Sequence, residues 1–207
     1  MPQEIVSKKR PVTGMTKQQQ SEQTKKALLE ATLDCLTENG YTGTSTTNVV
    51  KKAGVSRGAL AHHFPSKSKL VAEAAAYLVN KRARYTIEQL KIVEPGENTI
   101  EGWTRLQWQA YEKWFPANIE FMVAARTDPD LRQHFSEAID RYSQKMQSQQ
   151  SGFSPDFSSS PSPLLTQYVI GCFIRGLCLE RIVNDDALVN DIFDEFTRIL
   201  DVAVTKS

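Results

Sequence analysis

The sequence predicts an all-α protein in which a small helix-turn-helix domain is joined by a long helix to a larger helical domain. Apolar residues recur at helical spacing in almost every segment between turn signals, and no segment shows the alternation typical of a strand. Segment 45–70 has the pattern of two short helices separated by a glycine turn. With 207 residues, 40% of them hydrophobic and 24% charged, the chain is long enough to bury a core.

Charge is distributed unevenly along the chain, although the net charge is only +1. Residues 1–93 hold 15 Lys and Arg against 7 Asp and Glu, whereas residues 94–207 hold 10 against 17. A basic half on an acidic half indicates a nucleic-acid-binding module. Segment 1–20 is expected to be disordered, either a basic arm that follows a DNA groove or a solvated tail. It shows no apolar signal sequence, which favours a cytoplasmic protein.

Residues 21–70 are predicted to form the first domain, which begins with a helix over 21–39 that ends at Gly40. A second helix starts at the cap residue Ser45 and ends at Gly54, because glycine readily takes the left-handed conformation of a turn. The chain then turns into a short third helix.

The third helix, 57–64, sends Leu60 and Phe64 inward, while its other positions are small or basic. Such a surface suits a helix that lies in a DNA major groove. Segment 43–70 contains five Lys and Arg and no Asp or Glu. We expect Arg57 to reach a base edge and Lys67 a phosphate. The residues expected at the DNA are Ser45, Thr47, Arg57, Gly58, Ala59, His62, His63 and Lys67.

The segment carries, at fixed spacing, Ala53-Gly54-Val55-Ser56, Gly58, Leu60, His63-Phe64, Ser66-Lys67 and Leu70. This set resembles the DNA-binding signature of tetracycline-repressor-type (TetR family) transcriptional regulators over roughly residues 24–78. It departs at Ala61, where the family usually has a tyrosine that contacts a phosphate. The resemblance implies a dimeric regulator of double-stranded DNA, most often a repressor released from a palindromic operator by a small ligand.

A long connecting helix is predicted over 66–93, where it could carry a displacement from one domain to the other, with a hinge at 95–98. Residues 94–207 are expected to form the effector-binding and dimerisation domain. Its helices are predicted at 99–115, 116–127, 129–149, 163–184 and 187–205. Segment 150–163 is rich in Ser and Pro and is expected to be a mobile loop.

The last two of these helices are predicted to form a homodimer interface. Helix 163–184 is apolar around its circumference and must bury two faces, although Arg175 and other polar residues make it a poor membrane span. Helix 187–205 has an apolar stripe opposite an acidic one. The resemblance implies a four-helix dimer interface, and burial inside one monomer is the alternative. The residues expected in or directly behind the interface are Phe173, Leu177, Ile192 and Phe196.

Aromatic residues are concentrated between 103 and 142, which includes all three tryptophans. Such a stripe is more often plain core, but it can also surround an apolar cavity, and the resemblance implies an inducer there. The ligand is expected to be apolar or amphipathic, because this half shows no basic cluster. The residues assigned to it are Trp103, Gln107, Trp108, Tyr111, Phe121, Met122, Arg126, Tyr142 and Tyr168.

No catalytic or metal-ligating pattern is readable in the sequence. His62 and His63 have no carboxylate within a helical turn, and three cysteines without close spacing indicate neither a zinc site nor a disulfide framework. The chain is therefore expected to be no enzyme and to need no metal or cofactor. Two hypotheses remain: a ligand-responsive dimeric repressor, and a DNA-binding protein of the same fold without a small ligand, controlled by a protein partner or architectural in role.

Overall fold

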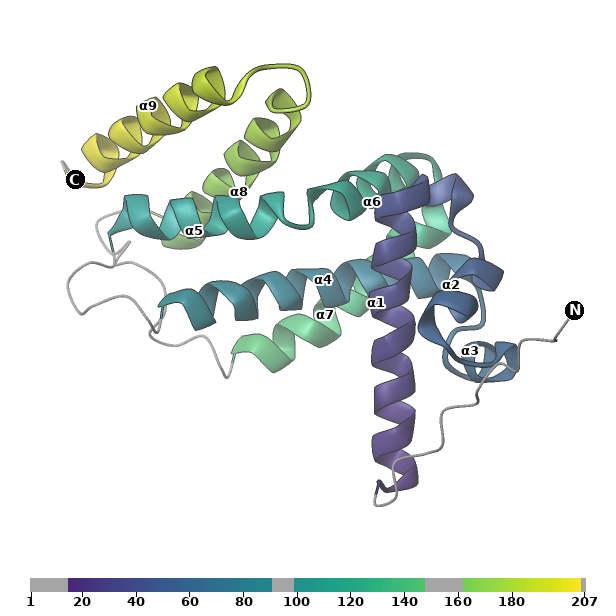
Figure 1. Cartoon of the computed structure of the whole chain (residues 1–207). Helices are drawn as coiled ribbons and strands as arrows, with labels where there is room; N and C mark the ends of the chain where they lie inside the picture. Colours follow the sequence, from purple (N-terminus) through teal and green to yellow (C-terminus); the bar gives the residue numbers. More distant parts are fainter. Residues whose placement is uncertain (1–14, 91–98, 148–161, 206–207) are drawn as a thin grey trace, which may run out of the picture.

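The computed structural model describes residues 15–90, 99–147 and 162–205, and within these ranges all regular structure is α-helical (Figure 1). This confirms the predicted fold class. The first group of helices is α1 (Lys17–Gly43), α2 (Thr46–Ala53), α3 (Arg57–His63) and α4 (Lys67–Leu90). The second group is α5 (Ile100–Glu112), α6 (Phe115–Thr127), α7 (Pro129–Gln147), α8 (Pro163–Glu180) and α9 (Asp186–Thr205).

Helix α1 begins earlier than predicted. The Thr16 hydroxyl accepts a hydrogen bond from the Gln19 backbone N–H at 3.2 Å, and the Gln19 side chain accepts one from the Thr16 N–H at 2.8 Å. This reciprocal capping box starts the helix at Lys17. The expectation of disorder up to residue 20 is therefore wrong for residues 17–20, while segment 1–14 of the expected arm lies outside the described residues.

The predicted stop at Gly40 appears as a kink, after which one further helical turn runs to Gly43. Gly40 has a φ of 66°, in the left-handed region. A Cβ at this position would lie 2.9 Å from a carboxylate oxygen of Glu120 on α6. The same oxygen accepts a hydrogen bond from the Tyr41 N–H at 2.8 Å. The kink therefore joins the end of α1 to the second half of the chain.

The long connecting helix is present, because α4 starts at Lys67 after the cap residue Ser66 and continues to Leu90. The predicted hinge at 95–98 lies outside the described residues, as does segment 148–161 of the predicted loop. The five C-terminal helices lie close to their predicted positions. Helix α8 is shorter than expected, since it ends at Glu180 and turns follow.

The described residues pack into two cores, and the first of them contains residues from both sides of position 94. The first core contains Leu28, Leu36 and Phe64 of the N-terminal helices, but also Phe121 of α6 and Leu131 of α7. The second core joins α5, α8 and α9 and contains Trp103, Trp108, Ile170, Ile174 and Phe193. Helices α6 and α7 thus contribute to the same core as the helix-turn-helix, so that domain packs against part of the second half of the chain.

Candidate nucleic-acid interface

The helix-turn-helix is built as the sequence indicates. Gly54 ends α2 with a φ of 68° in the left-handed region, and Val55 packs half-buried against the first core. The Ser56 hydroxyl then caps α3 by accepting from the Ala59 N–H at 3.1 Å. On α3, Leu60 and Phe64 are buried. The opposite side of α3 is therefore presented to solvent.

The exposed side of α3 carries Arg57, Gly58 and His62, while Ala59 and His63 are half-buried. Arg57 donates to the Thr47 hydroxyl across α2 and α3 at 3.4 Å, a long contact that brings two predicted DNA-contacting residues together. Arg57 is paired with no carboxylate of the described residues. Its guanidinium remains free to meet a base or a phosphate.

Ser45 caps α2, because its hydroxyl accepts a hydrogen bond from the Asn48 N–H at 3.1 Å. The hydroxyl proton is still available, so a phosphate could accept it. The neighbouring side chains of Thr47 and Asn48 are exposed. The start of α2 can therefore approach a DNA backbone.

The first-turn lysines of α4, Lys67 and Lys69, have partners inside the chain. The Lys67 ammonium donates to the Tyr41 carbonyl at 2.6 Å and lies 4.3 Å from the Tyr41 ring centroid. Burial lowers the pKa of Lys67. Lys69 donates to Glu137 at 3.2 Å, and Lys52 on α2 is paired with Glu38. Fewer cations than the five in the segment are therefore free for DNA.

The His63 imidazole has a pKa below its ordinary value, because it is partly buried and lies beside His62, whose ring centroid is 5.3 Å away. His63 is consequently neutral at neutral pH. A neutral imidazole can still donate one N–H to a phosphate, and protonation would strengthen that contact.

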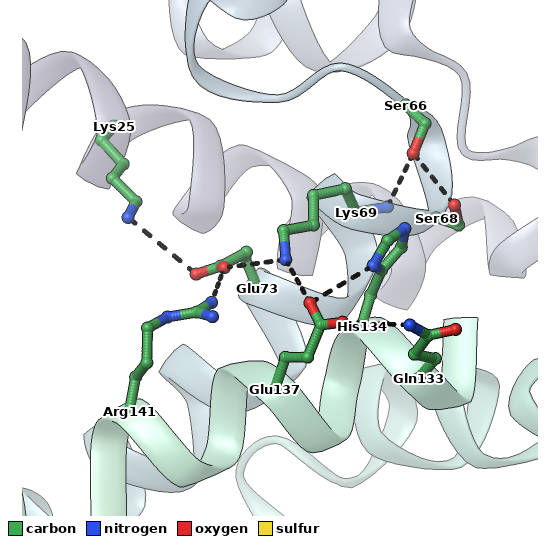
Figure 2. Close-up of polar contacts among 9 residues, drawn as sticks. All are labelled: Lys25, Ser66, Ser68, Lys69, Glu73, Gln133, His134, Glu137 and Arg141. Atoms are coloured by element: carbon green, nitrogen blue, oxygen red, sulfur yellow. Dashed lines mark hydrogen bonds and ion pairs between the residues drawn. The ribbon is translucent and has the colours of Figure 1, made fainter. Parts of the chain in front are cut away.

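A buried carboxylate on α4 connects the helix-turn-helix domain with α7 (Figure 2). Glu73 is 5% exposed and forms an ion pair with Arg141 of α7. Its carboxylate also lies 3.9 Å from the Lys25 ammonium on α1 and 3.8 Å from that of Lys69. Lys69 extends the network to Glu137 of α7. One acidic residue therefore holds three cations from three different helices.

Comparison with known proteins agrees with this geometry. The family model described as bacterial regulatory proteins of the tetR family matches residues 28–74. An HTH-type transcriptional regulator of Mycobacterium bovis, itself uncharacterized, is 34% identical over 133 residues, which cover 63% of this chain and 68% of that protein. The chain belongs to the TetR family. As a TetR-family regulator it is a DNA-binding transcriptional regulator and not an enzyme.

Other relatives extend the comparison. The HTH-type regulator CymR of Pseudomonas putida is 32% identical over 133 residues, but the match spans only 61% of this chain and 63% of CymR. The fold resembles that of a transcriptional regulator from Rhodococcus sp. Rha1, with a TM-score of 0.58 and 22% identity over 86% of this chain and 96% of that one. No helix in the described parts of this TetR-family chain is long and apolar enough to cross a membrane.

The structure separates the residues that were assigned to an effector. The second core contains Trp103, Trp108 and Tyr111, and Gln107 on the same helix is half-buried. Phe121, in contrast, lies in the first core. The exposed members are Met122, Arg126 and Tyr168, and the side chain of Tyr142 lies outside the described residues. The assigned set therefore forms no single site, because the aromatic segment supplies two different cores.

Two arginines that sequence reasoning missed meet at Tyr111. The Arg82 guanidinium of α4 lies 3.8 Å from the Tyr111 ring centroid. Burial acts to lower the pKa of Arg175 on α8, but a hydrogen bond with the Tyr111 side chain and the charges of Tyr111, Cys172 and Tyr168 together outweigh it, so the pKa is raised. Of these two arginines only Arg175 belongs to the second half of the chain, since Arg82 lies on the connecting helix α4. Within the described residues, buried Nη1 of Arg82 and Nε1 of Trp108 have no hydrogen-bond partner.

The four residues predicted in or directly behind a dimer interface are buried or half-buried within the single chain. Leu177 is 2% exposed in the single chain. Phe173 of α8 stacks on Phe196 of α9 with ring centroids 3.6 Å apart, so this contact joins α8 to α9 within one chain. Ile192 is half-buried beside them. The outward faces of α8 and α9 carry other apolar residues, which include Leu165, Tyr168, Val169, Leu179, Leu188, Ile199 and Val202.

Proposed function

We propose that the protein is a homodimer that places two copies of α3 in successive major grooves of a palindromic DNA site. The observation that carries this proposal is the exposed apolar surface on α8 and α9. Val169 is 51% exposed and Ile199 53% exposed, and they lie on faces where apolar residues recur every three or four positions. Exposed apolar residues at such spacing are typical of an interface between subunits.

The dimer is tested with charged substitutions that leave the monomer core untouched. Val169→Asp and Ile199→Asp should produce soluble monomers, since each would place an unpaired carboxylate in the interface. Val123→Asp is the matched control, because Val123 is 56% exposed but lies on α6. Molecular mass is measured by light scattering during size exclusion. A dimer that survives both interface substitutions at micromolar concentration contradicts the proposal.

On the DNA side, we assign base reading to Arg57 and phosphate contacts to Ser45 and His63, with Thr47, Gly58, Ala59 and His62 lying close to the bases. Lys67 contributes positive charge, although its ammonium is partly engaged by Tyr41. Arg57 is the strongest member of the set, because it is exposed, free of carboxylates and located in the first turn of α3.

We further infer that the protein is a repressor with an effector site where α4, α5 and α8 meet around Tyr111. The buried polar atoms of Arg82 and Trp108 lack partners in the described chain, and a ligand could supply the missing acceptors. Both atoms without a partner, Nη1 of Arg82 and Nε1 of Trp108, are hydrogen-bond donors, and Arg175 lies nearby. The ligand that fits is therefore amphipathic and carries an anionic group.

The position of Arg82 suggests how a ligand could release DNA. Arg82 and Glu73 lie on α4, the helix that begins directly after the helix-turn-helix. A ligand that contacts Arg82 can shift α4, and the ion pairs of Glu73 extend this shift to α1 and α7. Release requires only that the ligand binds more tightly to the conformation in which the two α3 helices are wrongly spaced for DNA.

The effector site is tested by a thermal-shift screen of aromatic and aliphatic carboxylates, with the corresponding alcohols as neutral controls. A carboxylate that binds should release DNA and change tryptophan emission with the same midpoint. Arg82→Met should abolish both effects, whereas the exposed Arg126→Met should keep them. Release that persists in Arg82→Met places the effector elsewhere, and a screen without any stabilising compound favours a regulator that has no small ligand.

A further inference from the structure

A cavity lies where α1 meets α4 and the turn between α5 and α6. Its volume is about 320 Å³, within the range of small-molecule sites. Neither Arg82 nor Tyr111 lines it. The lining residues that matter here are Lys26 of α1, Asn80, Arg84 and Tyr85 of α4, and Lys113 and Trp114 of the turn.

The cavity has an excess of positive charge. Its carboxylate Glu30 is already engaged by Lys81 and the Tyr77 hydroxyl. Burial acts to raise the pKa of Glu30, but these hydrogen bonds and the charges of Lys81 and Lys26 together outweigh it, so the pKa is lowered. The remaining acidic residue in the lining is Glu88. Three cations of the lining form no ion pair with any carboxylate of the described residues, and these are Lys26, Arg84 and Lys113. The balance of these four residues is two positive charges.

One wall of the cavity is aromatic. Tyr85 and Trp114 meet edge to face with ring centroids 5.7 Å apart. The Lys113 ammonium lies 5.1 Å from each of the two centroids. Because the Lys113 side chain is exposed and flexible, it can move off the rings and allow a planar group to stack on them.

A buried amide marks the interior of the cavity. Asn80 is 6% exposed, and its side-chain oxygen has no hydrogen-bond partner among the described residues. A buried acceptor without a donor is unfavourable, so a ligand that brings an N–H group is favoured there. Asparagine side chains pair well with amino-bearing bases, for which adenine is the usual example.

We propose that this cavity binds a nucleoside monophosphate whose base carries an amino group. The phosphate, which has close to two negative charges at neutral pH, matches the two excess positive charges of the cavity. The base stacks on Tyr85 and Trp114 and donates to Asn80. Since α1 and the turn between α5 and α6 both line the cavity, the bound nucleotide ties the helix-turn-helix domain to the second half of the chain.

The test is titration calorimetry of the full-length protein with AMP, in the absence of DNA and of any effector. AMP should bind, while adenosine and ribose 5-phosphate should bind at least tenfold more weakly, because each lacks one of the two recognised groups. The double variant Lys113→Gln/Arg84→Gln should weaken AMP binding at least tenfold. Both side chains are exposed, so circular dichroism should show an unchanged fold.

Two further variants locate the bound nucleotide. Arg57→Ala removes a cation from the DNA-reading surface, and Arg82→Met removes one from the effector region, so both should retain the wild-type affinity for AMP. The proposal is overturned if AMP does not bind at millimolar concentration, if the double variant binds it as well as the wild type does, or if Arg57→Ala or Arg82→Met abolishes binding. Adenosine that binds as tightly as AMP also overturns it.

Discussion

Replacing Glu73 by glutamine tests whether the buried ion-pair network stabilises the junction between the helix-turn-helix domain and α7. The substitution keeps the shape of the side chain but removes its charge. Glu73 is 5% exposed, whereas the side chains of its partners Lys25, Lys69 and Arg141 remain 39%, 21% and 52% exposed. The cations can therefore regain water when the carboxylate is lost.

The expected loss of unfolding free energy is about 2 kcal/mol, the value of one charge-assisted hydrogen bond in a partly buried setting. Of the three cations, Arg141 forms that hydrogen bond, while the Lys25 and Lys69 ammonium groups lie beyond hydrogen-bonding distance at 3.9 and 3.8 Å. In a chain of 207 residues this loss corresponds to a fall in Tm of roughly 4 to 8 °C.

The assay is urea unfolding followed by circular dichroism, with Glu137→Gln as the matched control. Glu137 shares Lys69 with Glu73, but its side chain is 44% exposed, so its loss should destabilise the protein much less. The reasoning is refuted if Glu73→Gln is as stable as the wild type, or if the two variants lose the same stability. A double-mutant cycle with Arg141→Gln then measures the coupling between Glu73 and Arg141.

Three further predictions concern DNA binding and the α1 kink. Arg57→Ala should weaken binding to a selected DNA site by about 1 to 3 kcal/mol, measured by fluorescence anisotropy, and should relax the preference at one base pair. An equal loss of binding free energy on random DNA would contradict base reading by Arg57. DNA affinity should rise from pH 8 to pH 6, because His63 is neutral in free protein and phosphate favours its protonation; His63→Gln should flatten this profile. Gly40→Ala should lower the unfolding free energy by about 1 to 2 kcal/mol, because alanine is strained at a φ of 66° and its Cβ would lie too close to the Glu120 carboxylate. The stability is measured by urea unfolding. An unchanged stability would mean that α6 moves away from the new methyl group.

The helices and the helix-turn-helix were predictable because their determinants are local. Caps such as Ser45 and Ser56, and the glycine at position 54, act on backbone groups within a few residues, so their effect is readable from the chain alone. The early start of α1 at Thr16 was equally local and could have been found from the Thr16 and Gln19 pair. Apolar spacing likewise placed Leu60 and Phe64 inside the domain.

Contacts between distant segments were decided only by the tertiary structure. The sequence showed five cations around the helix-turn-helix, but pairing of Lys69 with Glu137 depends on where α7 packs. Likewise, apolar periodicity predicted that α8 buries two faces and that α9 has one apolar stripe, but not which apolar side chains are turned outward. Periodicity indicates that a side chain is buried but not which residue it packs against. The contact of Arg82 with Tyr111 and the cavity between α1, α4 and the turn between α5 and α6 therefore depend on helix packing.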